Sequence, residues 1–144
     1  MSSPAMSKSS FRTMQPSDYQ VNKTWLAYRI NTAPLQVEGE AIDLYVLQDA
    51  ASMFLFGNAF APSGTAFPPA EDVEKLMASA RDKKNKWPSE LILLGNPGPE
   101  NTFAAVARRH GVAVRSVPES QMSLYLTDTR KSYQEFLFRD ASDA

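Results

Sequence analysis

The stretch Lys86–Gln121, "KWPSELILLGNPGPENTFAAVARRHGVAVRSVPESQ", decides the fold because it holds two strand patterns separated by a helix pattern. Its first part, Glu90–Leu94, is a continuous apolar run of the kind found in strands that are buried on both faces. A helix pattern over Pro99–His110 follows, with Gly111 as a C-terminal cap, and then a short strand over Val112–Val117. A strand, a helix and a strand in this order predict two parallel strands joined by a crossover helix.

The flanking residues complete the order of elements. Three strand patterns precede the opening stretch and form a meander, because the break at Asp49-Ala50-Ala51 is short enough for an antiparallel hairpin. An amphipathic helix comes next, and a last helix follows the opening stretch. The expected strands are Lys23–Thr32, Ala41–Gln48 and Ser52–Ala61, and the expected helices are Pro68–Trp87 and Thr127–Phe138. The order β-β-β-α-β-α-β-α predicts an α/β domain with a mixed five-stranded sheet and helices on its faces, which matches a ribonuclease H-like fold.

The length of 144 residues corresponds to about one domain. Residues 1–20 are rich in Ser, Met and Pro without periodicity, so we expect a flexible N-terminal tail in which only Phe11 and Tyr19 offer side chains that could dock. Residues 21–139 then form the single ribonuclease H-like domain, with Pro118–Leu126 as a linker before the last helix. Residues 140–144 are expected to fray.

Composition excludes several classes of function. The net charge of −1 provides no global basic field for nucleic acid. The absence of cysteine excludes disulfides, thiol nucleophiles and thiolate zinc sites, and the single histidine, His110, excludes a multi-histidine metal site within one chain. Neither a spanning apolar segment nor the apolar block of a secretory signal is visible, so a cytoplasmic, soluble domain without membrane contact is expected.

Two stretches resemble the catalytic core of retroviral-type integrases and related transposases. The run "LYVLQDAASMFLFGNAFAPSG" (Leu44–Gly64) resembles the second and third strands of that core. The opening stretch resembles the next part, with Trp-Pro, a strand, a turn, a helix, "HGV" and a short strand that ends in Pro. The resemblance extends from Trp25 to Phe138. It implies a chemistry in which three carboxylates converge on two divalent metal ions.

The resemblance also implies where those carboxylates would stand, namely in the first strand, at the end of the fourth strand and in a later helix. The first strand here has no acid, and Arg29 lies near the expected position. The fourth strand ends in Gly95 and Asn96, and the last helix retains only Glu135. One carboxylate with an amide cannot hold two Mg²⁺ ions, because hard cations need anionic oxygen ligands. We therefore expect a non-catalytic binding or assembly module without metal or cofactor.

The alternative is a metal-dependent nuclease or strand-transfer enzyme whose rearranged acidic site uses Asp49, Glu100 and Glu135. Asp49 ends a strand beside a turn, where Asp often bonds its own backbone. Glu100 falls in a first helical turn, where the helix dipole favours an acid. Asp43 alternates out of phase with the apolar face of its strand, so we expect it in solvent. His110 closes a helix, where a cation meets the negative end of the dipole.

Two charged or glycine-rich segments have structural explanations. The loop Gly95-Asn96-Pro97-Gly98 lies between a strand and a helix, where backbone N–H groups can bind an anion. Pro97 and Pro99 remove two of those donors, so a turn without ligand is expected. The helix over Pro68–Trp87 has acids near its start and bases near its end, which complement the dipole and predict a solvated face.

Partners are predicted on two grounds. Edge strands and the aromatic residues of "SMFLFGNAF" (Ser52–Phe60) offer a contact surface for a homo-oligomer or a protein partner. A weak contact with a nucleic-acid backbone is the alternative, through a cluster of basic residues at the ends of the last two helices and on the fifth strand. The candidates for that cluster are Arg108, Arg109, Arg115, Arg130 and Lys131.

Overall fold

The computed structural model describes residues 13–64, 67–95 and 101–143, and the side chains of the last helix as far as Tyr133. The strands are β1 (Thr24–Arg29), β2 (Leu35–Val37), β3 (Glu40–Asp49), β4 (Leu55–Pro62), β5 (Glu90–Leu94) and β6 (Ala113–Val117). The helices are α2 (Ala70–Lys84), α3 (Thr102–Arg109) and α4 (Ser123–Asp143), with two short 3₁₀ turns, η1 (Pro16–Asp18) and η2 (Glu119–Met122).

The sheet is mixed, as predicted. Its order is β2-β3-β1-β5-β6. Strand β4 pairs with β3 along the edge of β3 opposite to β1. Strand β1 runs antiparallel to β3 and parallel to β5, which in turn runs parallel to β6. The sheet has six strands rather than the expected five, because β2 turns through Glu38 and Gly39 (φ 52° and 84°) to pair with the start of β3. A three-residue strand is too short to show an alternation in the sequence.

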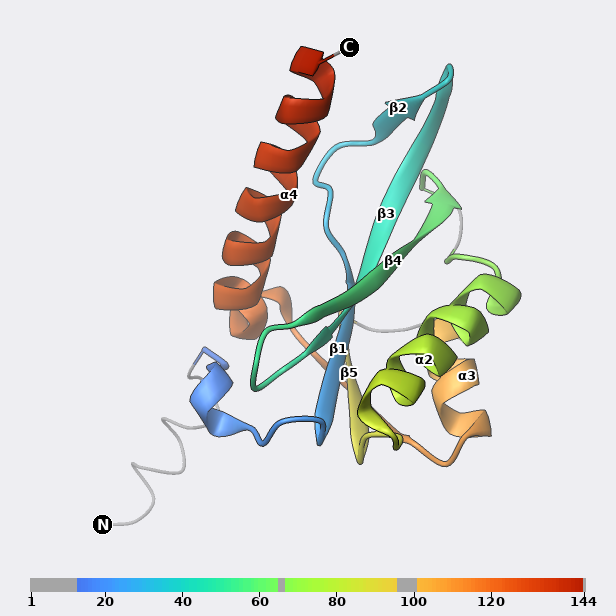
Figure 1. Ribbon diagram of the computed structural model, residues 1–144, viewed down its shortest axis with the longest axis vertical. Helices are drawn as coiled ribbons and strands as arrows, with labels where there is room; N and C mark the ends of the chain where they lie inside the picture. The colour runs from blue at the N-terminus through green and yellow to red at the C-terminus, as the bar shows by residue number, and fades with distance from the viewer. Residues whose placement is uncertain (1–12, 65–66, 96–100, 144) are drawn as a thin grey trace.

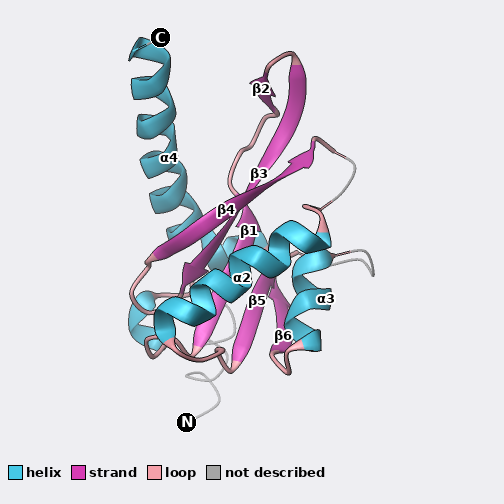
Figure 2. Ribbon diagram, turned by 45° about the vertical axis from the view of Figure 1, so that its right-hand side comes forward, coloured by secondary structure: helices cyan, strands magenta, loops and turns pink. Residues whose placement is uncertain are grey.

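Helices cover both faces of the sheet, so the central strand β1 is buried on both sides (Figures 1 and 2). Trp25 and Ala27 pack with α2 and α3, whereas Leu26 and Tyr28 point to the opposite face and pack with α4. None of these four side chains exposes more than 3% of its surface. Because successive residues of a strand point to opposite faces, a strand covered on both sides is apolar throughout, and β5 has the same character.

Capping residues set helix boundaries that differ by a few residues from the predicted ones. Asn101 adopts an extended conformation, and its Oδ1 accepts the backbone N–H of Ala104 at 3.1 Å, so α3 begins at Thr102 rather than at Pro99. Asn85 is left-handed (φ 63°) and ends α2 at Lys84, before the predicted end at Trp87.

Helix α4 begins earlier than the sequence suggested. The segment Pro118–Leu126, expected to be a linker, forms η2 and the first turn of α4. Met122, Tyr125 and Leu126 are buried in the core on that face of the sheet, which explains why the segment is ordered as helix. The helix backbone continues to Asp143. Neither α4 nor any other helix in the described part of the chain is both long and apolar enough to cross a membrane.

The packed part of the chain also begins before the expected boundary at residue 21. The side chain of Met14 exposes 5% of its surface within the α4-side core, and its backbone N–H donates to the carbonyl of Gln121 at 2.7 Å. Tyr19 packs against the same core, in agreement with its predicted docking. Phe11 lies outside the described residues.

Candidate functional site

Three buried polar side chains meet where the carboxyl end of β1 lies against α4. Tyr28 from β1, Gln48 from β3 and Thr129 from α4 each expose 2% of their surface or less. The Tyr28 hydroxyl donates to Gln48 Oε1 at 2.7 Å and lies 2.8 Å from Thr129 Oγ1. Because a phenol carries one proton, the Thr129 hydroxyl donates the second bond. We call this group the Tyr28 triad.

The Tyr28 triad is electrically neutral. Burial raises the pKa of Tyr28 above its ordinary value of 10.0, and the hydrogen bond from Thr129 only partly opposes this rise. Gln48 and Thr129 do not titrate, and Gln48 Nε2 donates to the carbonyl of Met53 at 3.0 Å. The triad therefore offers no general acid or base near neutral pH and no anionic oxygen.

A divalent metal ion does not fit the residues at this position. Among the described residues, the carboxyl ends of β1 and β5 contribute no carboxylate, and the buried side chains of η2 and of α4 as far as Tyr133 are Met122, Tyr125, Leu126 and Thr129. Asp128, the acid in the first turns of α4, is exposed. Across the described ranges no group of three His, Asp or Glu side chains is arranged to hold a metal ion. Magnesium needs anionic oxygen ligands, and the described side chains at this position supply none.

Asp49 has a structural role at the other end of β1, where it pairs with Trp25. Its carboxylate accepts the backbone N–H of Asn22 at 2.7 Å, and the backbone N–H and hydroxyl of Ser52 at 2.8 and 2.7 Å. These bonds agree with its interpretation as a turn residue. Glu100 lies outside the described residues, and Glu135 lies in α4 beyond the last described side chain.

Asp43 is buried, and its expected exposure to solvent is wrong. Its side chain exposes 4% of its surface, accepts Asn31 Nδ2 at 2.9 Å and the Gly64 N–H at 3.2 Å, and lies 3.6 Å from an Arg29 guanidinium nitrogen. Burial alone would raise the pKa of Asp43, but these partners hold it below its ordinary value of 3.8. The segments that follow β1 and β4 supply Asn31 and Gly64, so strand alternation could not reveal the burial.

A cavity of about 370 Å³ opens beside the Tyr28 triad, between α4 and the segment after β1. Its lining includes Ile30, Asn31, Leu35, Leu44 and Arg130. Arg130 Nε donates to the carbonyl of Ile30 at 2.8 Å, and its guanidinium lies 3.6 Å from Glu119. The lining is mostly apolar, and its polar side chains are Asn31, Thr32 and Arg130, without a carboxylate or a histidine.

The basic residues that the sequence singled out are divided between the two faces of the sheet. Arg108 and Arg109 lie on α3, and Arg130 and Lys131 lie on α4, across the sheet. Arg109 pairs with Glu74 at 3.1 Å, and Arg115 pairs with Glu90 at 3.2 Å. Arg108 and Lys131 are exposed. The five residues therefore do not form one continuous patch.

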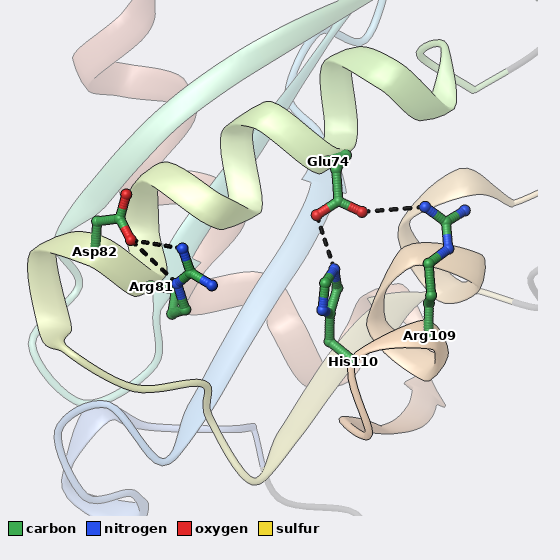
Figure 3. Close-up of polar contacts among 5 residues, drawn as sticks. All are labelled: Glu74, Arg81, Asp82, Arg109 and His110. Carbon is green, nitrogen blue, oxygen red and sulfur yellow. Dashed lines mark hydrogen bonds and ion pairs between the residues drawn. The ribbon is translucent and has the colours of Figure 1, made fainter.

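His110 links α3 to α2 as well as ending α3. Its Nε2 lies 2.7 Å from Glu74 Oε2, and Arg109 approaches the other oxygen of the same carboxylate (Figure 3). The His110 ring also stacks on Trp87, with centroids 4.2 Å apart and planes 17° apart. His110 occupies the C-cap position, as predicted. Among the described residues, the contacts of His110 include no nucleophile, so the cluster is best explained as a structural link between α2 and α3.

Comparisons with known proteins identify the fold. No protein-family model matches the sequence, and no curated protein is significantly similar to it. The structure is similar to a chain of the cryo-EM structure of the simian T-cell lymphotropic virus intasome in complex with the PP2A regulatory subunit B56 gamma. The TM-score is 0.58 at 14% identity, over 92% of this chain and 44% of that one. The chain thus spans less than half of that intasome chain.

The structure is also similar to the HTLV-2 integrase catalytic core domain in complex with magnesium, solved in a trimeric and a dimeric form. The TM-score is 0.55 at 12% identity for each, over 92% of this chain and 77% of that one. At such identities the likeness concerns the fold alone. It confirms the ribonuclease H-like architecture predicted from the order of strands and helices.

Proposed function

We propose that this chain is an integrase-core-like domain without metal-dependent catalysis, which serves in binding or assembly. The observation that carries the proposal is the Tyr28 triad. At the carboxyl end of the central strand, next to Arg29, which lies near the position where the resemblance to integrases calls for a metal-binding carboxylate, the chain has Tyr28 bonded to Gln48 and Thr129. This group is neutral and satisfies its own hydrogen bonds, so it needs no cation.

The enzymatic alternative has weaker support. Its three acids would have to converge, yet Asp49 lies at the amino end of β1 and already accepts bonds from Asn22 and Ser52. Tyr28 lies three residues beyond Trp25, the β1 residue that pairs with Asp49. A strand rises about 3.3 Å per residue, so Tyr28 is roughly 10 Å along β1 from the partner of Asp49, and the neighbouring Gln48 and Asp49 side chains point to opposite faces of the sheet.

A nuclease assay and a metal titration test the loss of catalysis. The purified chain is incubated with labelled single- and double-stranded DNA and RNA in Mg²⁺ or Mn²⁺, and Mn²⁺ binding is followed by calorimetry. We expect neither cleavage nor saturable binding. Metal-dependent cleavage that disappears in Glu135→Ala, but persists in the matched variant Asp82→Ala on the exposed face of α2, would show that the chain is an enzyme.

Assembly into a homo-oligomer is the form of binding that the fold favours. Strand β4, "LFGNAFAP", forms one edge of the sheet, contains no charged residue and exposes 51% of Phe60. Uncharged edge strands are prone to pair with another chain. The similar HTLV-2 integrase cores are described in dimeric and trimeric forms. Light scattering across a range of concentrations should detect a species larger than 16.0 kDa. A monomer at every concentration would remove the claim of assembly.

A further inference from the structure

An exposed aromatic ring lies among unpaired lysines at the amino end of β1, away from the Tyr28 triad. Phe54 follows the turn between β3 and β4 and exposes 47% of its surface. Lys83 Nζ and Lys84 Nζ, from the last turn of α2, lie 5.7 and 5.5 Å from the centre of its ring. We call these three residues the Phe54 surface.

The charge around this surface is strongly positive for a chain with a net charge of −1. Residues 81–86, "RDKKNK", contain four basic residues and one acid. That acid, Asp82, is bound to Arg81 at 2.7 Å. In the described part of the chain neither Lys83 nor Lys84 has an ion pair, whereas Lys75 on the same helix pairs with Glu71. Their charge is therefore available to a negatively charged partner.

Complementing the helix dipole explains lysines at the end of α2, but it does not explain the exposed ring beside them. A buried neighbour, Phe56, packs edge-on against Phe54 with centroids 5.5 Å apart, which holds the exposed ring in place. An exposed, supported ring next to mobile cations is the combination that binds single-stranded nucleic acid. Unpaired bases stack on the ring while phosphates contact the cations.

We propose that the Phe54 surface binds single-stranded nucleic acid, with one base on Phe54 and the flanking phosphates on Lys83 and Lys84. The phosphate contacts make the affinity depend on salt, whereas the stacking contact does not. A duplex should bind less well, because its bases are stacked on one another and not available to the ring. The inference does not rest on the loss of catalysis proposed above.

Fluorescence anisotropy with labelled oligothymidylate and oligouridylate of about 12 nucleotides tests the proposal, in EDTA so that any metal-dependent activity is silent. We expect binding at about 50 mM salt that weakens markedly at about 200 mM. Phe54→Ala should weaken binding roughly 5- to 100-fold with an unchanged salt slope. Replacing Lys83 and Lys84 with Gln should reduce that slope by about 0.7 per lysine.

Matched variants separate this site from general surface effects. Val37→Ala shortens an equally exposed apolar side chain on β2, away from the Phe54 surface, and Lys75→Gln removes a lysine from the same helix, so both should bind like the parent chain. Phe54→Trp should restore or strengthen binding by offering a larger ring. No binding at low salt would overturn the proposal. Equal losses of binding in the matched variants, or equal affinity for a duplex, would also overturn it. Tighter binding of an acidic peptide of glutamate and tyrosine would overturn it too, because the surface would then favour a protein partner.

Discussion

The hydroxyl of Tyr28 lies 2.8 Å from the hydroxyl of Thr129, although the two residues are 101 positions apart in the chain. The contact ties the central strand to the helix that covers it. In an active two-metal site of this fold, a strand and a helix would be held together through carboxylates and cations. Here the same two elements are held together by neutral hydrogen bonds inside the core.

Tyr28→Phe should destabilise the fold by about 1 to 3 kcal/mol, because Gln48 Oε1 and Thr129 Oγ1 lose a partner in a buried site. The free energy of unfolding in urea measures the effect. Tyr45→Phe is the matched control, since the Tyr45 ring is only partly buried and its hydroxyl has no hydrogen bond to a described residue. Equal losses in the two variants would contradict a specific role for the Tyr28 triad.

Tyr28 and Tyr125 also predict how the fold responds to alkali. Burial raises the pKa of both hydroxyls above the ordinary value of 10.0. The unfolded chain therefore releases these protons first, so the stability that they contribute is complete below pH 10.0 and is lost as pH rises above it. Thermal unfolding followed from neutral pH to about pH 11 should show this fall, and Tyr28→Phe should make it shallower.

Asp43→Asn should lower stability at neutral pH by about 1 to 3 kcal/mol, because it weakens the bonds to Asn31, Gly64 and Arg29. The pKa of Asp43 lies below 3.8 in the folded chain, so its contribution is present above that pH and is lost as pH falls through the lowered value. The difference between variant and parent should therefore shrink in acid. Asp82→Asn, at an exposed position, is the control and should change stability at neutral pH by less than about 1 kcal/mol.

Asn101→Ala should cost about 0.5 to 2 kcal/mol, because the first turn of α3 loses the side chain that accepts the Ala104 N–H. Asn101→Ser keeps an acceptor at the cap and should recover most of the loss. Chemical denaturation of the three proteins side by side gives the comparison. If Ser proves as destabilising as Ala, the side chain matters for packing rather than for capping.

The parts of the fold that the sequence predicted are those with local patterns. The apolar run of β5 and the amphipathic stripes of α2 and α3 depend on spacing within a few residues. Strand β2 was missed because three residues show no alternation. The start of α4 was misjudged because Ser120, Gln121 and Ser123 look like loop residues, and only burial of Met122 and Tyr125 reveals the helix.

The candidate site was harder to predict for a different reason. Tyr28, Gln48 and Thr129 stand on three separate elements, and no sequence spacing connects them. The sequence shows that the first strand lacks an acid, but it does not show which side chains pack together at that place instead. The remaining signal was the presence of Tyr28 and Gln48 beside apolar residues of their strands, which is weak because both strands also contain charged residues.

The parallel pairing of β1 with β5 also constrains how the chain reaches its native state. The side chain of Thr24 donates a hydrogen bond to that of Glu90, 66 positions further along the chain, so the centre of the sheet cannot close until the polypeptide is synthesised beyond β5. Contacts at such separation slow folding, because the loop must be closed before they form. Until α4 arrives, Leu26 and Ile92 remain open to water on one face. A nascent chain released before α4 should therefore be prone to aggregate, and folding of this domain on the ribosome should be completed only after α4 has been synthesised.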